Sequence, residues 1–209
     1  KARLGGHGGN QFTIVLRRVE GLEEVDARLE TWKQGFPNYF GMQRFGTGVV
    51  PSSEMGLALL RGEFERVVTL VLASRARHGR TLQAYLEASA GNFQEALALM
   101  PASCLLETAV LQHLVQNPSD FKGAAKCVPR HLRLLWCRSL ASHVWNRVVS
   151  LRLQEGRMGT GAVPGDLVLA QTDQGAIVRR LSKGEEASTP LSDVLLPVPG
   201  FGVEMPGNH

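Results

Sequence analysis

The sequence has few cysteines, and they form no pattern that marks a disulfide framework or a metal site. The three cysteines are odd in number, and no Cys-x-x-Cys pair or Cys/His cluster with zinc spacing occurs. This excludes a small disulfide scaffold and a zinc-ribbon type of domain. We expect Cys104, Cys127 and Cys137 to be buried thiols in a reducing, intracellular compartment. The nucleus, the cytoplasm and the mitochondrion all fit that expectation.

Long apolar runs and a strong excess of one charge are also lacking. No segment approaches the roughly 20 apolar residues that span a bilayer, so we expect no membrane partner. The sequence has 23 Lys+Arg against 19 Asp+Glu, a net charge of +4. This mild basicity permits RNA binding without requiring it. With 209 residues, of which 44% are hydrophobic, the chain can form one large or two small domains with apolar cores.

Two periodicities divide the chain near Gly62. Before it, residues 11–19 alternate apolar and polar side chains as a half-buried strand does, and short helices are predicted at 22–33 and 51–60. After it the pattern is almost continuously helical, and it changes again in the last fifty or so residues. The later predicted elements are helices near 64–74, 81–89, 93–100, 104–116 and 129–154, a β-hairpin of 166–170 with 176–181, and a strand at 194–196.

The most informative segment runs from Asn38 to Gly46 and reads Asn-Tyr-Phe-Gly-Met-Gln-Arg-Phe-Gly. It combines three aromatic rings, two glycines, side-chain amides and a guanidinium, and we expect it to form a loop. Rings can stack on bases, a guanidinium can pair with phosphate, and glycine lets the backbone approach a ligand closely. These are the groups needed to hold an unstacked RNA base.

This segment resembles the signature of the TruD family of pseudouridine synthases, N-Y-F-G-x-Q-R-F-G, at every specified position. The helical middle, with Ala96-Leu97-x-x-Met100-Pro101, is similar to the archaeal and eukaryotic branch. Four further segments resemble the family in the family's order. They are Leu4-Gly5 with Gly9-Asn10-x-Phe12-x-Ile14-x-Leu16-Arg17, Pro129-Arg130-x-Leu132-Arg133 with Ser142-x-x-Trp145-Asn146 and Ser150-x-Arg152, Gly165-Asp166-Leu167-Val168-Leu169, and Asp193-Val194-x-Leu196-Pro197-x-Pro199-Gly200.

The resemblance implies an α+β fold and an activity. Residues 1–62 would be part of a mixed-sheet pseudouridine synthase catalytic domain, and residues 63–209 a largely helical TRUD-type insertion domain with a small β element. The implied reaction isomerises uridine to pseudouridine in RNA, with neither a cofactor nor a metal. The implied partner is RNA (tRNA, rRNA or mRNA), and ribonucleoprotein partners are compatible with it.

The resemblance also implies site residues. Asn38, Phe40, Gln43 and Arg44 would contact RNA, with Phe40 stacking on the target base. Supporting residues would be Gly9, Asn10, Tyr39, Gly41, Phe45 and Asn146.

Structural roles compete with these assignments. Phe40 could fill the core, and core is the favoured role of Phe45. Asn38 could form an Asx-turn, and Gln43 with Arg44 could brace the loop. For Asn146, bracing a neighbouring loop is favoured over direct catalysis.

Two departures from the family pattern bear on the activity. Ala141 stands where the family usually has Gln. The family's nucleophilic aspartate follows a lysine upstream of the resembling segments, whereas no Lys-Asp pair occurs in these 209 residues. We therefore expect the chain to carry the base-holding loop without the nucleophile and to be inactive alone. The alternative is a non-catalytic TruD-like RNA-binding protein or ribonucleoprotein (ribosome) assembly factor.

Overall fold

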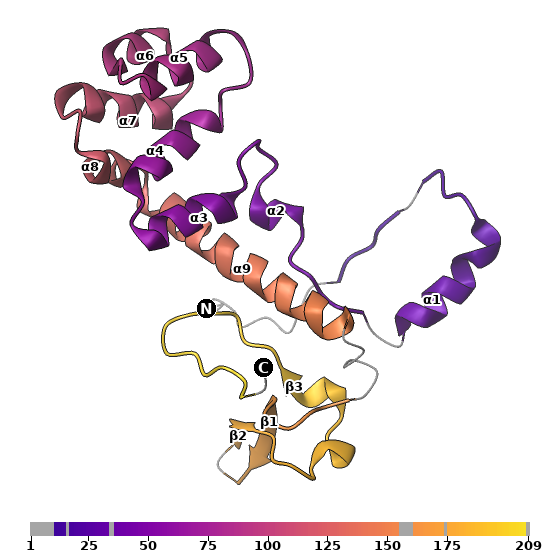
Figure 1. The fold of residues 1–209 in the computed structure, drawn as a ribbon. Coiled ribbons are helices and arrows are strands. Elements are labelled where there is room, and N and C mark those ends of the chain that lie inside the picture. The colour runs from indigo at the N-terminus through magenta and orange to yellow at the C-terminus, as the bar shows by residue number, and fades with distance from the viewer. Residues whose placement is uncertain (1–10, 16, 34–35, 155–160, 174, 208–209) are drawn as a thin grey trace, which may run out of the picture. The chain divides into compact units, whose positions relative to one another are not determined.

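The computed structural model describes residues 11–15, 17–33, 36–154, 161–173 and 175–207. It forms two compact units, residues 1–38 and 39–209. The α+β class is confirmed, since helices dominate and a small antiparallel sheet follows them (Figure 1). The division into family domains that the sequence predicts, between residues 62 and 63, differs from the boundary between these two units. It stays a prediction.

The first unit contains a short 3-10 helix, η1 (Leu22–Glu24), followed by α1 (Val25–Lys33). The predicted strand at residues 11–19 is wrong for the described residues, which have irregular backbone there. Phe12 and Ile14 are 77% and 78% exposed. A strand is stabilised by pairing and by burial of one face, and these residues have neither in the part of the chain that is described.

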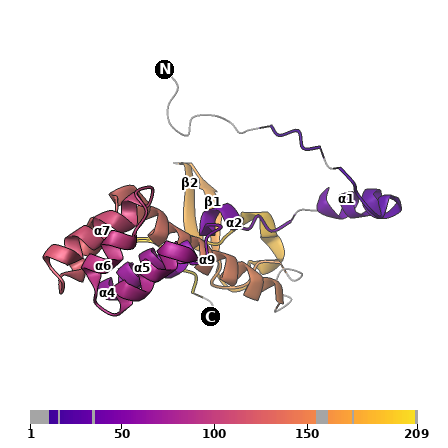
Figure 2. The ribbon, with the colours of Figure 1, turned by 90° about the horizontal axis from the view of Figure 1, so that it is seen from above.

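The second unit begins with α2 (Met42–Phe45), α3 (Ser52–Arg61) and α4 (Phe64–Ala73). Its further helices are α5 (Gly79–Ser89), α6 (Phe93–Leu99), α7 (Leu105–Gln116), α8 (Phe121–Lys126) and α9 (Arg130–Gln154). The helices predicted after Gly62 are thus confirmed. Figures 1 and 2 show α4 to α8 gathered near one end of α9. We call α3 to α8, with the first half of α9, the helical body.

An apolar core holds the helical body together. Its fully buried residues include Val67, Val71, Val110, Leu111 and Leu114. Because apolar residues recur at helical spacing, each helix turns one face toward this core. The predicted burial of the thiols is confirmed for Cys104, while Cys127 and Cys137 are half-buried, and burial raises the pKa of the Cys137 thiol.

Helices α3 and α9 pack closely because of Gly56. A Cβ atom there would collide with the backbone carbonyl of Trp136 on α9. Glycine therefore sets the approach of these two helices, and α3 in turn follows directly from the loop after α2.

The β element contains β1 (Leu167–Thr172), β2 (Gly175–Arg180) and β3 (Val194–Leu195), in the antiparallel order β2-β1-β3. The predicted hairpin is confirmed, with Leu169 opposite Val178. Two 3-10 helices lie between β2 and β3, η2 (Glu186–Ser188) and η3 (Leu191–Asp193).

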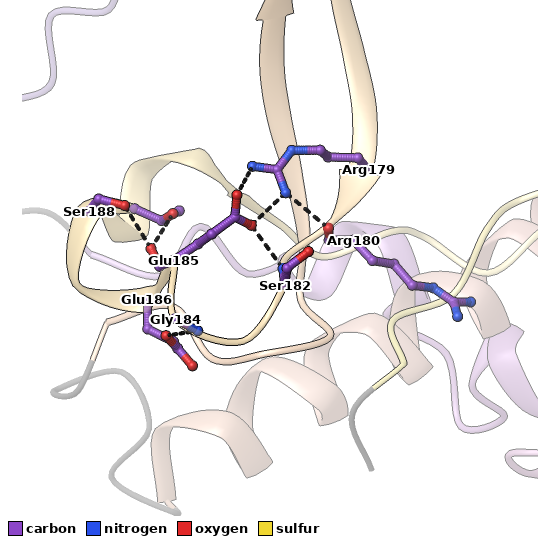
Figure 3. Close-up of polar contacts among 8 residues, drawn as sticks. Arg179, Arg180, Ser182, Gly184, Glu185, Glu186 and Ser188 are labelled. Atoms are coloured by element: carbon purple, nitrogen blue, oxygen red, sulfur yellow. Dashed lines mark hydrogen bonds and ion pairs between the residues drawn. The ribbon is translucent and has the colours of Figure 1, made fainter.

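Charged contacts fix the loop that follows β2 (Figure 3). The Arg179 guanidinium forms a fork with Glu185, at 2.7 and 3.0 Å, and it also donates to the carbonyl of Arg180. The same carboxylate accepts from the Ser182 N–H at 2.9 Å. Arg179 and the Ser182 N–H together hold the pKa of Glu185 below its usual range.

Candidate RNA-binding site

The segment from Tyr39 to Gly46 lies in the second unit. The expected loop contains one turn of helix, α2, which begins after Gly41 and ends before Gly46. Gly46 has φ 81°, a left-handed conformation that glycine adopts without steric cost. The turn places Phe40 just before a helix and Arg44 within it.

The side chain of Asn146, on α9, holds the backbone of Phe40 by two hydrogen bonds. The Phe40 N–H donates to Asn146 Oδ1 at 3.0 Å, and Asn146 Nδ2 donates to the Phe40 carbonyl at 2.9 Å. The amide thus satisfies both polar groups of one residue, as a neighbouring strand would. One helical turn later, Ser150 Oγ lies 3.2 Å from the Tyr39 hydroxyl and donates to the carbonyl of Asn146.

The Phe40 ring is half-buried and has two aromatic or cationic neighbours. It packs against Trp145 in a T-shaped arrangement, with centroids 5.4 Å apart. The Arg44 guanidinium lies 5.2 Å from the Phe40 centroid, within cation–π range. Trp145 Nε1 donates to the Leu196 carbonyl at 2.9 Å. Phe40 is therefore held at its backbone and its ring by consecutive residues of α9.

Comparison with known proteins shows the family to which a chain with this segment belongs. The family model described as tRNA pseudouridine synthase D (TruD) matches residues 1–204. The chain belongs to the TruD family. The mouse "Pseudouridylate synthase 7 homolog" is 35% identical over 98% of this chain, and the fission yeast (Schizosaccharomyces pombe) "Multisubstrate pseudouridine synthase 7" is 30% identical over 99%. The match covers 31% of the mouse protein and 35% of the yeast protein, so the chain spans about a third of their length.

The fold agrees with a solved structure of the same family. The crystal structure of the putative TruD from Methanosarcina mazei superposes with a TM-score of 0.67 and 26% identity, over 79% of this chain and 41% of that one. The TruD relatives therefore include a mammal, a yeast and an archaeon.

A buried ion pair links α9 of this TruD chain to the β element. Arg152 donates to both carboxylate oxygens of Asp166 at 2.8 Å, and Asp166 also accepts from the Val163 N–H. Asp166 is 1% exposed. The sequence placed both residues in segments resembling TruD proteins but gave no sign that they meet.

The remaining predicted site residues lie at different places. Gln43 is exposed, Arg44 is half-buried against Phe40, and Gly41 has open space where a Cβ would be. Phe45 is half-buried, with its ring 6.0 Å from that of His143. Asn38 is exposed and belongs to the first unit, while Gly9 and Asn10 lie outside the described residues.

No group of three or more His, Cys, Asp or Glu side chains among the described residues is placed to hold a metal ion. None of the helices in the described ranges is both long and apolar enough to span a bilayer.

Proposed function

We propose that this chain holds the target base in an RNA pseudouridine synthase. The observation that carries the proposal is the TruD signature folded around Phe40, with Asn146 and Trp145 fixing its backbone and ring. A ring fixed in this way loses little conformational freedom when a base stacks on it, and such stacking contributes roughly 1–3 kcal/mol per base. Arg44, beside that ring, can pair with a nucleotide oxygen or phosphate.

The reaction we propose is an isomerisation. A nucleophilic aspartate attacks the nucleoside, the bond between the ribose C1′ and uracil N1 breaks, and the uracil turns. The base rejoins the ribose through C5 and the aspartate is released, while N1 gains a proton and C5 loses one, so no cofactor is consumed. The base must leave the stack and enter a pocket shielded from water.

We propose that the nucleophile is supplied from outside these 209 residues. The five aspartates present have other positions: Asp26 lies in α1, Asp120 caps α8, Asp166 pairs with Arg152, and Asp173 and Asp193 lie in a turn and in η3. None follows a lysine. This observation also favours the second candidate, a non-catalytic TruD-like RNA-binding or ribonucleoprotein assembly factor.

Tritium release from RNA containing 5-tritiated uridine separates these functions. We expect release by the full-length protein and none by the 209-residue chain alone. Full-length protein that binds the RNA without releasing tritium would support the assembly factor, and release by the isolated chain would show that a residue within it is the nucleophile.

The Phe40→Ala variant of the full-length protein tests the role of the ring. Loss of a stacking platform should slow single-turnover release about tenfold or more, because about 1.4 kcal/mol corresponds to one decade. Loss of a fully buried ring would instead cost about 3–5 kcal/mol of stability. Phe45→Ala, at the end of α2 in the same segment, is the matched control. A Phe40→Ala protein that melts much earlier yet keeps its rate when folded would assign Phe40 to the core.

A further inference from the structure

A cavity lies beside the C-terminal end of the signature segment, where Gly46 forms part of its wall. It has a volume of about 570 Å³, within the usual range of ligand sites. Its walls come from the loop after α2, the ends of α3 and α4, α7 and α9. Its polar lining comprises Thr47, Ser52, Ser74, Arg75, Arg77 and Glu107, and its apolar lining Val50, Met55, Val71, Leu106, Leu132 and Trp136.

Arg75 is aimed by a buried acid. Glu107 on α7 is 3% exposed, and its Oε1 accepts from Arg75 Nε at 3.4 Å, while the Arg75 side chain is 65% exposed. Because Glu107 engages Nε, the two terminal nitrogens of the guanidinium remain for another acceptor, and neither has a partner among the described residues. A carboxylate on one edge of an arginine is a common way to orient it toward a second anion.

Arg77 adds a second positive charge to the lining of the cavity. Its side chain is exposed and has no hydrogen-bond or ion-pair partner in the described part of the chain. With Arg75 and Glu107, the charged lining carries a net +1. The N–H groups of Thr47 and Gly48 also donate to no acceptor within the described residues, although both residues line the cavity. Guanidinium and free N–H groups that line one cavity are the groups that bind phosphate.

We propose that this cavity is a second nucleotide subsite, which takes a phosphodiester-linked nucleotide of the RNA strand that carries the target uridine. The phosphate binds Arg75, Arg77 and the Thr47–Gly48 backbone, and the nucleoside lies over the apolar lining. The inference rests on the proposed function, because Gly46, at the end of the base-holding segment, forms part of the wall. One RNA strand can then contact both ends of the segment from Phe40 to Gly46.

The test measures binding of a short fluorescein-labelled oligouridylate to the full-length protein by fluorescence anisotropy over a salt series. Arg77→Gln should bind about tenfold more weakly, since it removes a charge-assisted hydrogen bond. The slope of log Kd against log salt should fall by about 0.7, as expected for one fewer phosphate contact on a single strand. Arg66→Gln is the matched control, an exposed arginine of α4 outside the cavity.

Arg75 requires a paired design, because its removal would leave Glu107 buried without its partner. Arg75→Gln is therefore combined with Glu107→Gln and compared with Glu107→Gln alone, with thermal melts showing that both are folded. The double variant should bind the oligouridylate more weakly than Glu107→Gln, and equal binding by the two folded proteins would remove Arg75 from the subsite.

Replacing one phosphodiester of the oligouridylate by an uncharged linkage identifies the phosphate that the cavity binds. In a series of oligouridylates that each carry one methylphosphonate, one position should weaken binding to the wild-type protein and have no further effect on Arg77→Gln. Equal effects of every position on both proteins would overturn the subsite. So would uridine monophosphate that binds as tightly as the oligonucleotide and with the same dependence on Arg77, because the site would then take a free nucleotide.

Failure of the proposed function gives a different result. If the wild-type protein binds no oligouridylate, both the base-holding role and the subsite are wrong. If the wild-type protein binds but Arg77→Gln binds equally well with an unchanged salt slope, the subsite alone is wrong.

Discussion

The helical body and the β element are stabilised in different ways. The helical body buries large aliphatic residues such as Leu111 and Leu114, which are 0% exposed. The β element has a small core of Ala162, Val168 and Leu181. Ion pairs contribute there instead: Asp166 pairs with Arg152 of α9, and Glu185 pairs with Arg179. One region thus depends on apolar burial and the other on paired charges.

Helix α9 belongs to both regions, and the difference bears on function. Its first half packs in the helical core through Trp136, while its second half contacts the β element through Trp145 and Arg152. Asn146, which holds Phe40, lies in that second half. The signature segment is therefore positioned by the part of α9 that polar contacts stabilise.

The largest expected effect comes from Asp166→Ala. It leaves the buried Arg152 guanidinium without its partner, which typically costs about 3–5 kcal/mol. Because the core around β1 is small, we expect the hairpin amides to lose hydrogen-exchange protection while those of α7 keep theirs. Asp173→Ala, in the exposed hairpin turn, is the control. Equal loss of protection in α7 would show that the two regions unfold together.

Leu111→Ala tests the dependence of the helical body on apolar burial. It removes a fully buried side chain from the helical core, and we expect a loss of about 2–5 kcal/mol in urea or thermal unfolding. Leu105→Ala, in the same helix and 77% exposed, should change stability little. A small effect of Leu111→Ala would mean that the helical body does not depend on apolar burial.

Asn146→Ala tests the second half of α9, the part of this helix that holds Phe40 and contacts the β element. Two hydrogen bonds to the half-buried Phe40 are lost, at about 0.5–1.5 kcal/mol each. We expect tritium release by the full-length protein to slow by about tenfold, with a smaller fall in RNA affinity. A misplaced Phe40 ring should disturb the position of the target base in the reaction more than it disturbs the initial binding of the RNA. Tyr39→Phe, which loses only the contact with Ser150, is the control. Unchanged turnover in Asn146→Ala would exclude a positioning role.

The sequence predicted the helical body well because its signals are local. Apolar spacing and breaks at Gly62, Gly91 and Pro101 place α4 to α7 within a few residues of their observed bounds. The hairpin is predicted in a similar way, from two segments typical of strands and a Gly-containing turn between them.

Contacts between distant residues could not be predicted in this way. Asn146 and Phe40 are 106 positions apart, and nothing in their local patterns links them. The wrong strand at residues 11–19 has the same origin, since alternation shows that a segment suits a strand but cannot supply the strand that pairs with it. Even the family motif identified Phe40 without showing that Arg44 would lie against its ring.

Acid pH should produce the smallest effect, in the loop after β2. The fork with Arg179 lowers the pKa of Glu185, so the folded state binds this proton less tightly than the unfolded chain does. The stabilisation is therefore complete above the ordinary value of about 4.5 and is lost as the pH falls through the lower, folded-state pKa. Both side chains are solvent-accessible, so salt should weaken the effect further. Hydrogen exchange of the β2 amides, followed from neutral to acid pH, should show a loss of protection that Glu185→Gln removes and the control Glu186→Gln retains. An unchanged acid profile in Glu185→Gln would mean that paired charge contributes nothing to this loop.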